Sequence, residues 1–161
     1  MTNQDLTFLQ GNKKFNYRVC AIMIAGGKLL AMRDERAPYY YLPGGRVRFG
    51  ETAEAAVIRE IQEELGITAR CLRPLWLNQA FFTEDVEKTE FHELCLYFLI
   101  DITSTPLLSK GDCFQTSEGG KIHTFQWLAL DSLKDQYLYP TFLKTEIFHL
   151  PDSLTLRTEY Q

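Results

Sequence analysis

The chain has 161 residues, of which 45% are hydrophobic and 24% are charged, as in an ordinary globular domain. Its formal net charge of −4 at pH 7 disfavours sequence-independent binding of nucleic acid, although it leaves room for a local basic pocket. The N-terminus lacks a basic start followed by an apolar run, and no apolar stretch approaches the ~18 residues that span a bilayer. We therefore expect a cytoplasmic protein without a membrane partner, with its four scattered cysteines reduced.

The first half of the chain is expected to form three strands and one helix. The strands are predicted at residues 17–25, 28–33 and 39–45, and the helix at residues 53–65. Two glycines at 26–27 join the first two strands as a hairpin, and Pro43 ends the third strand in a glycine-containing loop. Thr52 can cap the helix, and Gly66 is its natural stop.

The second half is dominated by a long strand pair. Residues 71–83 and 91–102 predict antiparallel strands, followed by a loop at 110–121, a strand at 122–130 and a second amphipathic helix at 139–150. The strands and helices do not alternate regularly, which argues against a doubly wound parallel sheet. We therefore expect a single domain over residues 1–161, of the α/β class, with a mixed β-sheet and two main helices.

The stretch "REIQEEL" (59–65) places Glu60, Glu63 and Glu64 on one side of the first predicted helix. Carboxylates three or four residues apart repel each other by a few tenths of a kcal/mol per pair. One interpretation is a solvated acidic face. The other is a cation site, because carboxylates one helical turn apart can hold Mg²⁺ and leave its other positions to water and substrate phosphates.

The segment from Gly45 to Ile67 resembles the Nudix box, and every defined position of that motif is matched. The matching residues are Gly45, Glu51, Arg59, Glu60, Ile61, Glu63, Glu64, Gly66 and Ile67. Outside this box, residues 39–45 and "FQWLALDSL" (125–133) are similar to segments of many family members. The resemblance implies the Nudix fold, an α/β/α sandwich around a mixed β-sheet. It also implies hydrolysis of a nucleoside diphosphate linked to another group.

The resemblance further implies how the box works. A divalent cation, Mg²⁺ or Mn²⁺, would be held by Glu60, Glu63, Glu64 and the carbonyl of Gly44. Glu51 and Arg59 match a pair that braces the loop against the helix. The alternative for this pair is an exposed ion pair worth under about 1 kcal/mol.

The general base and the phosphate-binding residues have several candidates. Members of the family take the base either from the box, here Glu64 with Glu63 beside it, or from a later loop, here Glu118. Three arginines near the metal loop have guanidinium groups that suit phosphate oxygens, namely Arg46, Arg33 and Arg48. The aromatic residues on the predicted strands are expected to belong to the core or to an interface.

Three functions remain open on these grounds. The first is a metal-dependent pyrophosphohydrolase that acts on a small nucleotide by attack of water on phosphorus. The second is removal of pyrophosphate from the 5′ end of RNA, which the acidic composition disfavours. The third is a catalytically idle nucleotide-sensing module, against which the unbroken set of carboxylates counts. The first 16 residues and the 71–102 pair could also serve a homodimer.

Overall fold

In the computed structural model, the protein is built from two β-sheets. The structure describes residues 4–161, and residues 1–3 of the N-terminal segment lie outside the described residues. The larger, mixed sheet contains β1 (Thr7–Gln10), β2 (Lys13–Ile22), β5 (Gly44–Arg46), β6 (Arg70–Thr83), β7 (Glu90–Asp101) and β10 (Thr155–Tyr160). The smaller, antiparallel sheet contains β3 (Ile24–Ala25), β4 (Lys28–Asp34), β8 (Cys113–Glu118) and β9 (Lys121–Ala129). The chain also forms helices α1 (Ala53–Leu65) and α2 (Leu143–Glu146) and the 3₁₀ turns η1 (Leu107–Lys110) and η2 (Leu130–Asp135).

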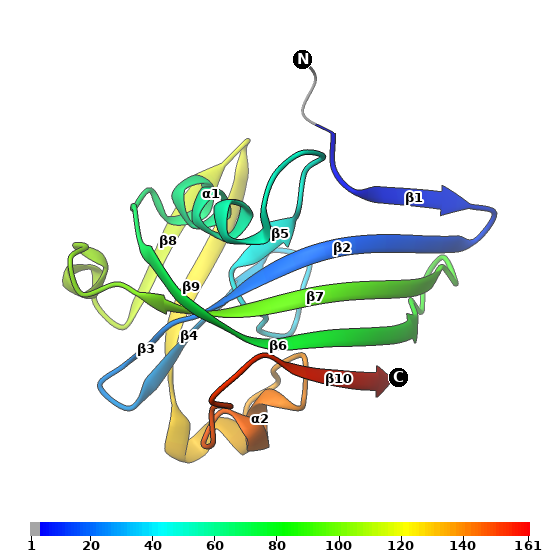
Figure 1. Cartoon of the computed structure of the whole chain (residues 1–161). Coiled ribbons are helices and arrows are strands. Elements are labelled where there is room, and N and C mark those ends of the chain that lie inside the picture. Colours follow the sequence, from blue (N-terminus) through cyan, green and yellow to red (C-terminus); the bar gives the residue numbers. More distant parts are fainter. Residues whose placement is uncertain (1–3) are drawn as a thin grey trace.

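A hydrophobic core lies on each side of the sheets. Helix α1 buries Val57 and Ile61 in the same cluster as Val19 of β2. On the other side, Phe142 beside α2 packs edge-on against Trp76 of β6, with the ring centroids 5.3 Å apart. The two helices therefore lie on opposite sides of the sheets (Figure 1), and the predicted α/β/α arrangement with a mixed sheet is confirmed.

Helix α1 has the predicted boundaries. The hydroxyl of Thr52 accepts a hydrogen bond from the amide of Ala55 at 3.1 Å, and Gly66 adopts a left-handed conformation with φ 69°. In that conformation the Gly66 amide donates to the carbonyl of Gln62. Both ends of the helix are thus satisfied by the residues that the sequence marks for the purpose.

The predicted glycine hairpin is also confirmed, although its first strand is divided between the two sheets. Residues 26–27 both have positive φ and connect β3 to β4, with Ile24 opposite Leu29. Met23 separates β2 from β3, so the apolar run passes from the larger sheet into the smaller one. The predicted long strand pair is confirmed: it consists of β6 and β7, which run antiparallel. The strand predicted at 122–130 is confirmed as β9.

Two predicted loop and strand segments were wrong. Residues 110–121 were expected to be a loop but contain β8, whose Phe114 stacks on Phe125 of β9. The strand expected at the start of residues 39–45 is reduced to isolated bridges at Tyr40 and Tyr41. The glycines expected in the following loop instead begin the strand β5. Glycine allows this pairing because it lets the β5 backbone approach β2 closely.

The helix expected at 139–150 is a single turn, α2. Its apolar residues are nevertheless buried: Phe142, Leu143 and Ile147 are all under 10% exposed. A single helical turn packed against the sheet is enough to bury these three side chains. The apolar pattern of residues 139–150 therefore predicted their burial correctly but not the length of the helix. Within residues 4–161 no helix is long and apolar enough to cross a membrane.

Candidate active site

The candidate site is built around two glycines of β5 that run close to β2. Gly44 lies opposite Cys20, and Gly45 lies opposite Val19. A Cβ atom on Gly44 would lie 2.1 Å from the carbonyl oxygen of Val19, and one on Gly45 would lie 2.4 Å from the carboxylate carbon of Glu60. Both positions therefore require glycine, the first to pair with β2 and the second to make room for a carboxylate.

Glu64 is held from the last turn of α1 against this loop. Its Oε1 accepts a hydrogen bond of 2.9 Å from the amide of Gly44, and the residue is only 8% exposed. Burial raises the pKa of Glu64 well above its ordinary value, and the charges of Glu60 and Glu118 raise it further. The Gly44 amide partly offsets this increase. This contact uses the Gly44 amide, and the role of its carbonyl as a metal ligand stays a prediction.

Glu60 lies one turn earlier, over Gly45. Its Oε1 accepts a hydrogen bond of 2.8 Å from Nη1 of Arg59. Burial is the largest effect on this carboxyl and raises its pKa, with repulsion from Glu63 and Glu118 acting in the same direction and Arg59 acting against them. The site therefore holds two partly buried carboxylates whose negative charge is incompletely balanced by protein groups.

Arg59 joins helix α1 to the preceding loop. Its Nε donates to Oε2 of Glu51 at 2.7 Å, and its Nη2 donates to Oε1 of Glu51 at 3.0 Å and to the carbonyl of Arg46 at 3.0 Å. The side chains of Arg59 and Glu51 are 18% and 16% exposed, so this bidentate pair is not an exposed surface ion pair. Arg59 lowers the pKa of Glu51. The contact has the geometry of the predicted brace.

Two of the three predicted arginines lie near this loop. Arg48 is 3.5 Å from Glu63 and 3.9 Å from Asp5, and Arg46 is 3.7 Å from the same aspartate. Arg33 lies elsewhere, with its guanidinium 5.3 Å from the ring centroid of Tyr40. Along β4 the side chains alternate between the two cores, and Arg33 shares its face with Leu29 and Ala31 of the α2-side core. The structure therefore does not bring Arg33 to the carboxylates.

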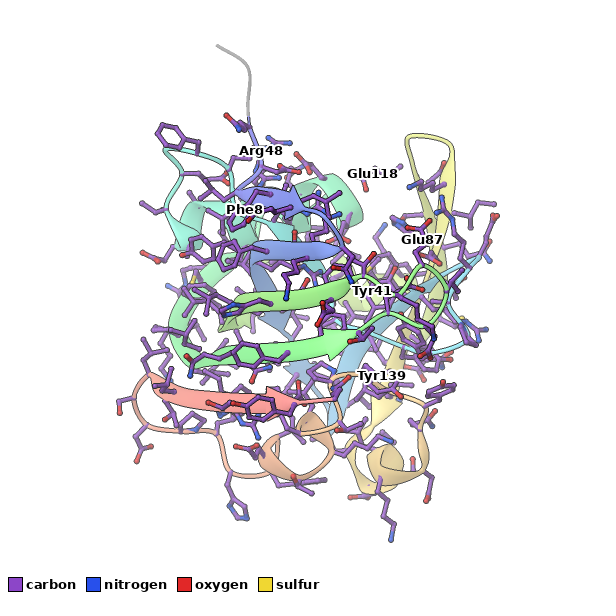
Figure 2. All side chains as sticks on the ribbon, turned by 90° about the vertical axis from the view of Figure 1, so that its right-hand side faces the viewer. Phe8, Tyr41, Arg48, Glu87, Glu118 and Tyr139 are labelled. Atoms are coloured by element: carbon purple, nitrogen blue, oxygen red, sulfur yellow. The ribbon has the colours of Figure 1, made fainter. Side chains whose placement is uncertain are left out.

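Glu118 reaches the site from the end of β8. The hydroxyl of Thr116, two residues earlier, donates to the backbone carbonyl of Glu64 at 3.0 Å. This bond fixes the end of β8 against the end of α1, and Figure 2 shows Glu118 beside that helix. Sequence reasoning missed Thr116. Its contact depends on tertiary packing and leaves no local signal in the sequence.

The carboxylate oxygens of Glu60, Glu63 and Glu64 suit a hard divalent cation, although each of these side chains accepts a hydrogen bond from another group of the protein. Within residues 4–161 no three Asp, Glu, His or Cys side chains surround a common metal position. Nη1 of Arg59 instead contacts both Glu60 and Glu63. A cation bound between these oxygen ligands would replace that contact while the bidentate pair with Glu51 remains. Carboxylate oxygens are the ligands that hard divalent cations prefer.

The raised pKa values predict an unusual pH dependence of stability. Between the ordinary carboxyl pKa of 4.5 and the raised values, the native protein binds more protons at Glu60 and Glu64 than the unfolded chain does. Their contribution to stability therefore increases as the pH falls through this window. Without divalent cations, we expect a higher thermal unfolding midpoint just above the ordinary carboxyl pKa, at about pH 5, than at about pH 8.

Glu64→Gln should reduce this difference, because it removes the more strongly perturbed carboxyl. The lowered pKa of Glu51 does not interfere, since its effect is confined to pH values below about 4.5. A midpoint that falls on acidification in both proteins would contradict the prediction.

Comparisons with known proteins identify the family. The NUDIX domain model matches residues 14–145. An ADP-ribose pyrophosphatase from Methanocaldococcus jannaschii is 29% identical over 119 residues, which cover 72% of this chain and 68% of that protein. An 8-oxo-dGTP diphosphatase from Escherichia coli is 65% identical over 26 residues, 16% of this chain and 20% of that protein.

The fold is similar to that of a mutator MutT protein from Bacillus halodurans, with a TM-score of 0.60 and 18% identity. The alignment covers 88% of this chain and 89% of that one, and at this identity it supports the fold alone. The predicted family resemblance is confirmed by the match of the domain model to most of the chain. The chain therefore belongs to the NUDIX family and is a hydrolase that acts on pyrophosphate bonds.

Proposed function

We propose that this chain is a metal-dependent pyrophosphohydrolase that cleaves a nucleoside diphosphate linked to another group by attack of water on phosphorus. The observation that carries the proposal is the burial of Glu60 and Glu64 against Gly44 and Gly45, where the pKa of each carboxyl is raised. Such a site is costly unless a cation completes it. A substrate with two adjacent phosphates would supply the further oxygen ligands.

The chain's own residues would bind and position the reacting groups. Carboxylates of Glu60, Glu63 and Glu64 would hold the cation, which when bound polarises phosphate oxygens and lowers the pKa of water. The amide of Gly44 keeps Glu64 in place, and the bidentate Arg59–Glu51 pair holds the loop to the helix. Arg46 and Arg48 are the nearest candidates for binding phosphate oxygens.

Glu118 is the better candidate for the general base. Glu64 already accepts the Gly44 amide and is almost fully buried, so its freedom to collect a proton from water is limited. Glu118 is half-buried at the end of β8 and close enough to Glu60 and Glu64 for its charge to raise the pKa of both. A carboxylate in that position can accept the proton of an attacking water.

The relatives suggest two substrate classes. One is a nucleoside diphosphate sugar, since one relative bears the name ADP-ribose pyrophosphatase. The other is an oxidised nucleoside triphosphate, since another is named 8-oxo-dGTP diphosphatase. The longer alignment favours the first class. Removal of pyrophosphate from RNA is disfavoured by the net charge of −4, and an idle nucleotide sensor is disfavoured by the complete set of carboxylates.

The deciding experiment is hydrolysis of ADP-ribose and 8-oxo-dGTP in heavy-oxygen water with Mg²⁺ or Mn²⁺. We expect cleavage between two phosphates, with the label on a phosphate product, and no turnover of simple phosphate monoesters. Label on a sugar carbon would contradict attack at phosphorus. Turnover of a monoester at a comparable rate would contradict the requirement for a diphosphate.

We predict that Glu118→Gln lowers kcat by at least about tenfold, because glutamine cannot accept the proton from water. Steady-state kinetics should show the loss in kcat rather than in KM, and the slope of rate against pH should change. Asp131→Asn is the matched control, since Asp131 is an exposed acid of η2 on the α2 side of the sheets. An unchanged rate in Glu118→Gln would return the role of base to Glu64.

A further inference from the structure

An aromatic row crosses the larger sheet away from the carboxylates. It consists of one residue from each of five neighbouring strands, which pair in register from β1 to β10: Phe8, Phe15, His92, Phe81 and Tyr160. Neighbouring rings lie 4.5 to 5.6 Å apart between centroids. The row lines a hollow of about 520 Å³, and the proposed hydrolysis uses none of its members.

This row is exposed. Phe8 is 61% exposed and Tyr160 is 78% exposed, although both belong to strands of the sheet. Leu156, on the same face of β10 as Tyr160, is 65% exposed and extends the apolar surface. Figure 1 shows that α1 lies over the other end of the larger sheet, away from the free ends of β1 and β10. A continuous exposed apolar surface of this kind marks an interaction site.

The orientation of the rings favours a protein partner over nucleic acid. Phe8 and Phe15 are stacked at an interplanar angle of 21°, and Phe81 and Tyr160 at 17°. Within each pair the two facing ring surfaces are therefore occupied by one another, so a nucleobase cannot insert between them. The ring edges and the outer faces of Phe8 and Tyr160 remain accessible, and they suit close packing against other apolar side chains.

The charges beside the row favour a second copy of the same chain. Lys13 and Glu90 lie side by side on β2 and β7, with Nζ and Oε2 3.6 Å apart, and both line the same hollow. One positive and one negative group on a single face make that face complementary to itself when it is rotated about a twofold axis.

We propose that the aromatic row is a homodimer interface, in which the row of one copy packs face to face on the row of a second copy. Two sheets packed in this way would form a sandwich across the twofold axis. Lys13 of each copy would face Glu90 of the other, so that the charges lie beside the apolar centre. This proposal is independent of the proposed hydrolysis, and it gives a location to the homodimer expected from the first strands and the 71–102 pair.

Analytical ultracentrifugation of the full chain tests the interface. We expect the parent protein to sediment as a dimer and the double variant Phe8→Lys/Tyr160→Lys to sediment as a monomer that keeps the circular dichroism spectrum of the parent. Leu108→Lys is the matched control: Leu108 is 56% exposed in η1, away from the row, and this variant should remain a dimer. A parent protein that is monomeric at every soluble concentration would overturn the proposal, as would a dimer that survives both lysines.

A mixing experiment tests the charge contact between copies. Lys13→Glu gives a face with two acids and Glu90→Lys a face with two bases, so each variant alone should be monomeric. Mixed in equal amounts, they should form heterodimers. If mixing restores no dimer, Lys13 and Glu90 do not meet across an interface. A single-stranded oligonucleotide that binds the parent but not Phe8→Lys/Tyr160→Lys would overturn the dimer in favour of nucleic acid.

Discussion

Replacement of Glu64 by glutamine is expected to lower kcat by at least about a hundredfold while the protein remains folded. Glutamine has the shape of glutamate, and its amide oxygen can still accept the hydrogen bond from Gly44. It lacks the negative charge that a divalent cation requires. The loss should therefore appear in catalysis and in metal binding, and not in the fold.

Two measurements separate these effects. Mg²⁺ or Mn²⁺ should raise the thermal midpoint of the parent, because a ligand of the native state alone stabilises it, and should raise that of Glu64→Gln much less. Without a cation, the variant should be at least as stable as the parent at neutral pH, since it no longer buries a charge. Glu54→Gln, an exposed acid in the first turn of the same helix, is the control. Activity of Glu64→Gln within a few-fold of the parent would rule out Glu64 as a metal ligand.

Helix α1 and its carboxylates could be predicted because every signal they depend on is local. The Thr52 cap, the apolar period and the Gly66 stop act within a few residues of one another, and the structure keeps all three. The same is true of the glycine hairpin at 26–27. The spacing of the glutamates predicted a shared face, and the structure places Glu60 and Glu64 against the glycine loop.

The unpredicted parts depend on partners far away in the sequence. Strand β10 pairs in parallel with β6, so that Thr155 lies opposite Trp76, and no pattern within β10 reveals this. Strand β8 carries few apolar residues, and Phe114 on Phe125 is a tertiary contact. The side chain of Asp5 reaches the arginines of the box loop from the far end of the chain. The contacts of Asp5 with Arg46 and Arg48, which lie near the carboxylates, could therefore not be predicted from the sequence.

Gly45→Ala should remove most activity at little cost in stability. The new Cβ would lie 2.4 Å from the carboxylate carbon of Glu60 and 2.4 Å from its Oε1, which is far too close, so the Glu60 side chain must move. That side chain is flexible, and its displacement costs the fold little. It does take the carboxylate away from its place one turn before Glu64, and we expect kcat to fall by at least about a hundredfold.

Gly44→Ala is the informative comparison, because its Cβ would lie 2.1 Å from the backbone carbonyl oxygen of Val19. A backbone atom of a buried strand cannot give way as a side chain can, so β5 would have to separate from β2. We expect this variant to lose both activity and several degrees of thermal midpoint, on the order of 2 kcal/mol or more. Calorimetry and steady-state kinetics on the two variants would distinguish the cases. If Gly45→Ala keeps full activity, then Glu60 need not lie over Gly45 during catalysis, and the cation site must be sought between Glu63 and Glu64.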